Sequence, residues 1–320
     1  MNPQEILLAA IRKQITAADS MNDTIATVLD ISYDAAHRRV SGKSKFSIDE
    51  TILLCQHFKL SLDHVFKSEK KMVVEKTKEV DSEKDLIQYF EDSATHLKEF
   101  LQTENPMIFY SAKDIPLFYT IGGSLLSKFK LYVWLNLLIG TENIPPFENF
   151  TVSHQLQEHT SLMQSLFAKA TVHEIWNDTT INSSIQQILY FFESGLLTIQ
   201  NAVELYQDVK NILLTIETKS SQNNAQYHLF QNDLLILNNN VLVSNETKSK
   251  LFIPYTMLGY FITDDTETTK NASDYFNHQI KNSKSLNLSG TRDRKLFFNK
   301  AHQKIEYYLQ RLTNNVSLEF

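Results

Sequence analysis

The chain has 320 residues, of which 42% are hydrophobic and 11% aromatic. That length predicts two domains, and the apolar fraction excludes a wholly disordered chain. The formal net charge of −6 argues against a protein that coats nucleic acid irrespective of sequence. With only seven glycines and six prolines, the composition favours helices over glycine-rich β-architectures and phosphate-binding loops.

The cysteine and hydropathy patterns indicate a cellular compartment. Cys55 is the only cysteine, which excludes an intramolecular disulfide and a zinc site built from several thiolates. The first residues lack the basic region and apolar core of a signal peptide. The most apolar window, residues 125–139, is interrupted by Lys128, Lys130 and Asn136 and is shorter than the roughly 20 residues that cross a bilayer. We therefore expect a cytoplasmic protein with no membrane span.

The first third of the chain divides at a charged segment. Residues 1–67 read as five short helices with brief connections. Residues 68–85 mix lysine and glutamate densely around a short apolar island, and we interpret them as a solvated linker; the alternative is a short strand or helix that spaces two domains. Apolar residues then recur at helical spacing from Leu86 to Leu101, until Asn105 and Pro106 end the run.

The second domain is expected to span residues 86–320 and to be mostly helical. Residues 107–110 are apolar enough for a strand, and 124–139 read as a buried helix that ends at Gly140. Helical spacing of apolar residues over 185–192 and 199–216 predicts consecutive antiparallel helices.

The end of the chain contains the strongest strand signal. Two apolar runs, 234–237 and 241–243, flank an asparagine turn and predict a hairpin or small antiparallel sheet.

A last helix opens at Thr291, after Gly290. The predicted fold class is therefore mainly α, with a five-helix N-terminal domain and a larger, mostly helical C-terminal domain that carries a small antiparallel β element.

The most specific pattern lies between residues 22 and 66. Residues 22–29 and 33–40 read as two short helices joined by a three-residue turn. Ser32 is a good N-cap for the second helix. Gly42 suits the left-handed conformation in which a chain often leaves a helix.

This arrangement resembles the helix-turn-helix of Cro/C1-type, phage repressor-like regulators. Three further pieces follow in the family's order: a glycine-bearing basic loop at 42–45, Asp-x-x-x-Leu-Leu at 49–54, and a segment similar to Ser-Leu-Asp-x-x-Phe at 60–66. Asp30 stands where the family usually has glycine, and Arg39 replaces a more apolar residue. The resemblance covers about a fifth of the chain and implies a lambda-repressor-like DNA-binding domain.

The resemblance also implies roles for individual residues. The second motif helix would enter the DNA major groove, with base-edge contacts from Tyr33, Asp34, His37 and Arg38. Arg38 can offer a bidentate fork to guanine, and Asp34 can accept from cytosine N4. Backbone phosphates would be met by five residues, namely Asn22, Thr24, Ser41, Lys43 and Lys45.

Two residues of this helix have a structural interpretation. Asp34 would also favour the amino-terminal dipole of its own helix without reading a base. Arg39 is better interpreted as lying along the helix and pairing with Asp30 or another acidic residue.

Other chemistries find little support in the sequence. His154 and His159 are five residues apart, which turns their side chains away from each other on a helix. His173 and Glu174 follow a little further on, but we read the histidines as polar surface residues and expect no metal site. Gly122-Gly123 alone is too weak for a phosphate site, and no nucleotide-binding or nucleophile-elbow motif is present. We expect no cofactor and no enzymatic activity.

These observations predict a dimeric transcriptional regulator that binds double-stranded DNA sequence-specifically. The C-terminal domain would dimerise and offer a place for an unknown effector ligand or protein. Most aromatic residues of that domain must be core, but the following are candidates for lining a pocket: Phe109, Tyr110, Phe118, Tyr119, Tyr132, Trp134, Tyr190, Phe191, Phe192 and Tyr255. The alternative is an interaction or effector protein whose helix-turn-helix docks a partner.

Charge is distributed unevenly between the two predicted domains. Residues 1–67 contain eight basic and eight acidic side chains, so the whole acidic excess lies in residues 68–320. Binding to DNA is therefore expected to be modest, dependent on salt and dependent on sequence.

Overall fold

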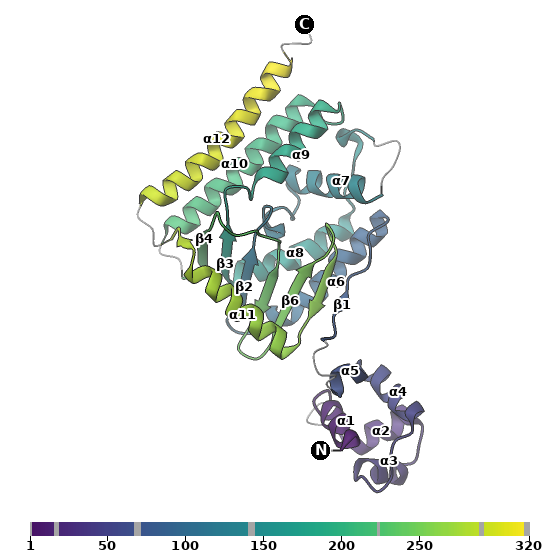
Figure 1. Cartoon of the computed structure of the whole chain (residues 1–320). Helices are drawn as coiled ribbons and strands as arrows, with labels where there is room; N and C mark the ends of the chain where they lie inside the picture. The colour runs from purple at the N-terminus through teal and green to yellow at the C-terminus, as the bar shows by residue number, and fades with distance from the viewer. Residues whose placement is uncertain are drawn as a thin grey trace. The chain divides into compact units, whose positions relative to one another are not determined.

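The computed structural model describes residues 2–15, 19–66, 72–139, 145–222, 225–287 and 291–316. The chain divides into two compact units, Met1–Val74 and Glu75–Phe320, and Figure 1 shows the elements of each. Each unit has a hydrophobic core of its own. No helix among the described residues combines the length and apolar character needed to cross a membrane.

The N-terminal unit consists of short helices, as predicted. They are α1 (Pro3–Arg12), α2 (Met21–Leu29), α3 (Tyr33–Val40), α4 (Ile48–His57) and α5 (Leu62–Val65). One buried cluster joins them: Leu7, Ile11, Ile25, Leu29, Ala36, Leu54, Cys55 and Val65. Cys55 is a core residue here, and burial raises the pKa of its thiol.

Side-chain caps fix where these helices begin. Asn2 and Glu5 form a capping box at α1, and Ser47 and Glu50 form another at α4. In each box the cap side chain accepts from a backbone N–H while the glutamate accepts from the cap's own N–H, so two otherwise unpaired donors are satisfied. The starts of these two helices are therefore fixed by contacts between residues three apart in the sequence.

The larger unit is built on an eight-stranded mixed sheet with the order β1-β7-β6-β5-β2-β3-β4-β8. The neighbours β2, β3 and β4 run parallel, and every other pair is antiparallel. The strands are β1 (Glu75–Lys76), β2 (Met107–Ser111), β3 (Thr171–Trp176), β4 (Tyr227–Gln231), β5 (Val241–Ser244), β6 (Ser249–Pro254), β7 (Tyr260–Thr263) and β8 (Lys284–Ser285).

Helices cover both faces of this sheet (Figure 1). They are α6 (Glu83–Leu101), α7 (Leu125–Ile139), α8 (His154–Lys169), α9 (Asn182–Glu193), α10 (Ile199–Ser221), α11 (Thr266–Lys281) and α12 (Thr291–Val316), with the 3₁₀ turns η1 (Leu117–Tyr119) and η2 (Phe147–Asn149). Helix α11 packs on one face through Phe276, against Phe109 and Leu242 of the sheet. The other helices build the main core on the opposite face.

The predicted fold class is wrong for this unit, which is α/β rather than mostly helical with a small antiparallel element. The strand β3 escaped prediction because its sequence, Thr-Val-His-Glu-Ile-Trp, places two polar residues at its centre. His173 is also not the surface residue expected. Glu174 is fully buried and His173 is half-buried, because β3 lies between two parallel neighbours and both of its faces are covered.

The predicted hairpin is wrong in its first strand. Residues 234–237 form a loop, in which Leu234 and Ile236 are 94% and 97% exposed. The antiparallel ribbon runs instead through β5, β6 and β7. Leu237 is buried in the cluster that contains Phe109 and Phe276, and Leu235 packs against that cluster, so the run contacts the core through these two side chains although it forms no strand.

The segment expected to be a linker contributes to the sheet. Its residues 75–76 form β1, which pairs with β7 at the sheet edge, and its residues from 83 onward begin α6. Residues 67–71 lie outside the described part of the chain. Gly140 and Gly290, the expected boundaries of α7 and α12, also lie outside the described part. Both helices are present at the predicted positions in the chain.

A buried carboxyl group lies in the main core. Glu174 Oε2 accepts hydrogen bonds from Trp176 Nε1 and from the Tyr227 hydroxyl, each at 2.9 Å. Burial raises the pKa of Glu174 to about 7, although hydrogen bonds from Tyr227, Tyr119 and Trp176 and the charge of Lys219 lower it. The unfavourable desolvation of the carboxylate thus outweighs four favourable interactions.

This carboxyl should make stability depend on pH. Because its pKa is higher in the folded chain than the ordinary 4.5, its contribution is fully present below pH 4.5 and is lost as pH rises through 7. The loss amounts to about 3 kcal/mol of unfolding free energy. We expect Glu174→Gln to remove this dependence, measured by urea denaturation of both proteins across the range.

The comparison between the two proteins isolates this group. His173 has a pKa lowered to about 4 by burial and by His228, and it affects both proteins alike. A stability difference between Glu174→Gln and the parent chain that stays constant with pH would contradict the prediction.

Candidate functional site

Helices α2 and α3 form the helix-turn-helix, and the turn has the expected backbone. Asp30 adopts φ 52° and ψ 47°, the left-handed conformation for which the family usually has glycine. Ile31 N then donates to Ala26 O at 3.0 Å, closing the turn. Ser32 caps α3 by accepting from Ala35 N at 3.3 Å. Aspartate tolerates this conformation better than most residues, so the substitution preserves the turn.

Packing of α3 leaves one surface free within the N-terminal unit. Ala36 is fully buried against the core. The four residues expected at base edges, Tyr33, Asp34, His37 and Arg38, are all exposed. Because they occupy positions i, i+1, i+4 and i+5 of the helix, they lie on one continuous surface.

Asn22 connects two of these side chains. Its Nδ2 donates to the Tyr33 hydroxyl at 3.2 Å and lies 3.4 Å from Nδ1 of His37. The rings of Tyr33 and His37 are nearly parallel, with their centroids 6.5 Å apart. Asn22 is expected at a phosphate, and its side chain makes this positioning contact as well.

The other residues expected at phosphates fall into two groups. Ser41, Lys43 and Lys45 are exposed in the loop after α3, where Gly42 has φ +75°. Thr24 is half-buried, and its hydroxyl donates to Ser20 O at 2.9 Å.

Gln4 holds the loop that carries these lysines. Its Nε2 donates to Arg39 O at 2.7 Å and to Ser44 O at 2.9 Å, and its Oε1 accepts from Phe46 N. The contact spans about 40 residues of chain, and no local pattern around Gln4 indicated it.

Arg39 pairs with an acidic residue, as expected, and that residue is Glu50 rather than Asp30. Its Nε and Nη2 donate to the two carboxylate oxygens at 3.0 and 2.6 Å. The hydrogen bond from Arg39 holds the pKa of Glu50 below its usual value despite desolvation. Arg39 is therefore neutralised, whereas Arg38, Lys43 and Lys45 have no ion-pair partner among the described residues.

Metal ligands do not cluster in the described part of the chain, where no three His, Cys, Asp or Glu side chains lie close enough to hold an ion. His154 is exposed at the start of α8, 3.9 Å from Glu158.

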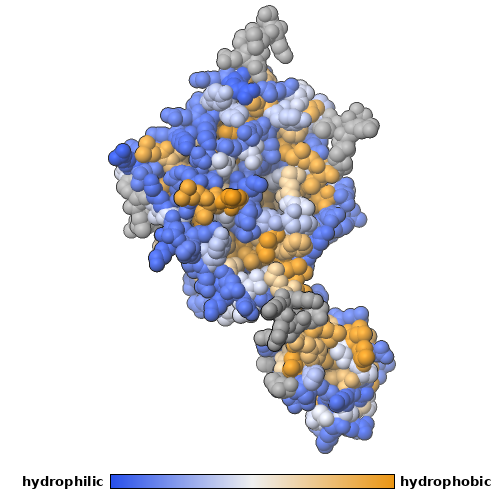
Figure 2. Space-filling view, in the orientation of Figure 1, coloured by the Kyte–Doolittle hydropathy of each residue, from blue (hydrophilic) through white to orange (hydrophobic). Residues whose placement is uncertain are grey.

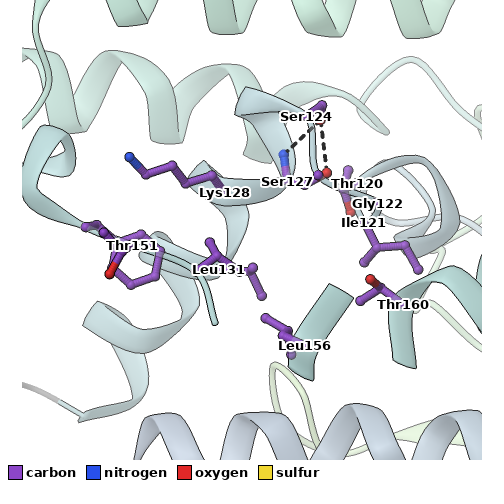
Figure 3. A pocket seen from close by; sticks show the side chains of 13 residues that line it. Thr120, Ile121, Gly122, Ser124, Ser127, Lys128, Leu131, Thr151, Leu156 and Thr160 are labelled. Atoms are coloured by element: carbon purple, nitrogen blue, oxygen red, sulfur yellow. Dashed lines mark hydrogen bonds between the residues drawn. The ribbon is translucent and has the colours of Figure 1, made fainter. Parts of the chain in front are cut away.

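The Gly-Gly pair lines a cavity of about 300 Å³ at the amino end of α7 (Figure 3). Gly122 and Gly123 both have positive φ, and Ser124 Oγ accepts from Ser127 N at 3.1 Å. The amino end of this helix is already neutralised, because Asp208 Oδ2 accepts from Leu126 N at 3.0 Å. A carboxylate at this place opposes the binding of a phosphate.

A scan against protein-family models gives no match for the chain, and searches of curated proteins and of solved structures give none either. The resemblance of residues 22–66 to Cro/C1-type regulators therefore rests on the residues themselves.

The pair of Arg39 and Glu50 should anchor α3 to α4. Both side chains are about one-fifth exposed, and removing the carboxylate leaves the Arg39 charge unpaired. Glu50→Gln should therefore destabilise the N-terminal unit by about 1–3 kcal/mol. Faster exchange of backbone amides in residues 32–51, measured by hydrogen–deuterium exchange on the intact chain, would report this loss.

The double variant Arg39→Met with Glu50→Gln serves as the control. It leaves no charge unpaired, so part of the protection should return. Equal exchange in Glu50→Gln and the parent chain would show that the ion pair does not hold the two helices together.

Proposed function

We propose that residues 2–66 bind double-stranded DNA sequence-specifically and that the chain is a cytoplasmic transcriptional regulator. The observation that carries the proposal is the surface of α3. Four side chains able to contact base edges are exposed together there, while the opposite side of the helix is buried through Ala36 and tied to α4 through Arg39. A recognition helix needs this combination of a free polar surface and a rigid support.

Electrostatics support the same assignment. Arg38, Lys43 and Lys45 offer unpaired positive charge on α3 and the loop that follows, and Asp34 is the only acidic residue between Tyr33 and Lys45. Lys43 and Lys45 suit phosphate contacts, and Arg38 suits bidentate recognition of guanine.

One helix-turn-helix contacts few base pairs, so we propose a two-fold dimer on a pseudo-palindromic operator. The two half-sites would then be centred about 10 base pairs apart, or a multiple of that spacing.

A second candidate function is docking of a protein through the same unit. Helix α4 exposes Ile48, Ile52 and Leu53, the first of them at 80%, and Figure 2 shows apolar side chains gathered on this unit. Exposed apolar side chains are typical of protein interfaces. This surface is separate from the exposed side chains of α3, so variants of α3 discriminate between the two functions.

The first test selects duplexes from a random pool with the intact chain and then compares two matched variants. Arg38→Gln and Lys59→Gln each remove one exposed positive charge, but only Arg38 lies on α3. Arg38→Gln should lose about 1–3 kcal/mol of discrimination between the selected duplex and a scrambled one.

Lys59→Gln should retain that discrimination. Failure to enrich any duplex, or equal behaviour of the two variants, would overturn base recognition by α3 and favour the docking function.

The second test concerns phosphate contacts. If Lys43 binds a phosphate, Lys43→Gln should weaken binding to selected and scrambled duplexes alike. The slope of log affinity against log salt should become shallower by about 1 per subunit. Fluorescence anisotropy over a salt series measures both quantities. An unchanged slope would exclude Lys43 from the interface, and Lys59→Gln again provides the control.

A further inference from the structure

A cavity of about 540 Å³ lies in the larger unit, outside the carboxyl end of β2. Its lining comes from the segment after β2, from α7 and α9, and from the loops β4–β5 and β6–β7. Open α/β sheets bind their ligands in the crevice beyond the carboxyl ends of the parallel strands. The volume also falls within the range of pockets for small molecules. Position and size are therefore those of a ligand site.

The cavity has a charged floor that is fixed in place. Lys130 of α7 is only 2% exposed, and its Nζ donates to Asp114 Oδ2 at 2.8 Å, to Gln187 Oε1 at 3.0 Å and to Ser184 Oγ at 3.2 Å. Asp114 Oδ1 accepts in turn from Ile115 N and from Ser184 Oγ, each at 2.9 Å. These contacts hold both charges in one geometry.

Hydrogen bonds also fix the backbone of Lys113 and Asp114. Asn239 Oδ1 accepts from Lys113 N at 2.8 Å and from Asp114 N at 3.2 Å, which joins the segment after β2 to the loop β4–β5. A buried ion pair costs desolvation that an apolar core of the same shape would not. Its presence beside a cavity, rather than inside the packed core, points to binding.

The charge of the lining selects the kind of ligand. Lys130 is paired with Asp114, so the formal charge of +1 in the lining belongs to Lys113. The Asp114 carboxylate also accepts from Ser184 Oγ in the first turn of α9, which offsets the dipole of that helix. The exposed ammonium of Lys113 is therefore the group that favours an anion.

Apolar and aromatic side chains make up about half of the lining, and polar side chains make up the rest. Trp134 and Tyr255, both named by the sequence analysis as candidates for lining a pocket, lie here with Met257 and Leu258. We propose that this cavity binds a small organic anion, in which a carboxylate or phosphate monoester is attached to a flat ring. The anionic group would face Lys113, and the ring would contact Trp134 or Tyr255. The assignment does not depend on DNA binding by residues 2–66.

Isothermal titration calorimetry on the intact chain tests the proposal with two pairs of probes. AMP is compared with adenosine, and indole-3-acetate with indole-3-acetamide, so each anion has an uncharged counterpart of similar shape. At least one anion should bind about tenfold or more tightly than its counterpart, as expected for hydrogen bonds to charged groups. The pair that responds distinguishes a phosphate from a carboxylate. If neither anion binds more tightly than its counterpart, the proposal is overturned.

Variants locate the binding. Lys113→Gln changes an exposed residue that the fold does not require, and it should reduce anion affinity by a factor of about three to ten. The double variant Lys130→Gln with Asp114→Asn removes a pair of opposite charges while keeping hydrogen-bonding groups, so the preference for the anion should change less than in Lys113→Gln. Lys128→Gln is the control, because Lys128 lines the other cavity, 4.5 Å from the Phe147 ring.

The outcomes separate this site from the proposed function. Equal loss in Lys113→Gln and Lys128→Gln would place the anion elsewhere and overturn the assignment. If the double variant does not fold, the comparison of Lys113→Gln with Lys128→Gln still tests whether the anion binds in this cavity. Loss of anion binding with duplex selection intact would concern the cavity alone, and failed duplex selection with anion binding intact would concern the DNA proposal alone.

Discussion

The parallel pairing of β2, β3 and β4 is the constraint from which the larger unit follows. Parallel neighbours cannot be joined by a tight turn, so the chain must cross over between them. It does so through α7 and α8 between β2 and β3, and through α9 and α10 between β3 and β4. Each crossover starts from a carboxyl end of the sheet, which brings α7 and α9 to the edge where the larger cavity lies. The same pairing encloses β3 and forces Glu174 into the core.

The N-terminal unit was the part of the chain that local sequence could predict. Its helix starts are encoded by caps such as Ser32 and Ser47, and its turn by the single residue Asp30. Contacts between segments remote in sequence were harder to predict. Glu50 is the third residue of the capping box of α4, which is a local contact, but its pairing with Arg39 depends on how α4 packs beside α3.

The larger unit shows where such prediction fails. Helices α6, α10 and α12 have regular apolar periods and were found from them. Strand β3 was missed because a histidine and a glutamate interrupt its apolar run. The glutamate is tolerable in the core because Trp176 and Tyr227 donate hydrogen bonds to it. The charged floor of the cavity was likewise invisible, because Lys130 was seen merely as an interruption of an apolar helix, and its partners Asp114 and Gln187 come from elsewhere in the chain.

The contact of Asn22 with Tyr33 and His37 has a consequence for redesign. Two of the four exposed positions of α3 share one amide from the preceding helix, so they are not independently exchangeable. Replacing His37 also changes the surroundings of Asn22 and thereby of Tyr33. A library that redesigns the exposed surface of α3 would need to vary positions 22, 33 and 37 together. A single substitution would change both the replaced side chain and the surroundings of the other two.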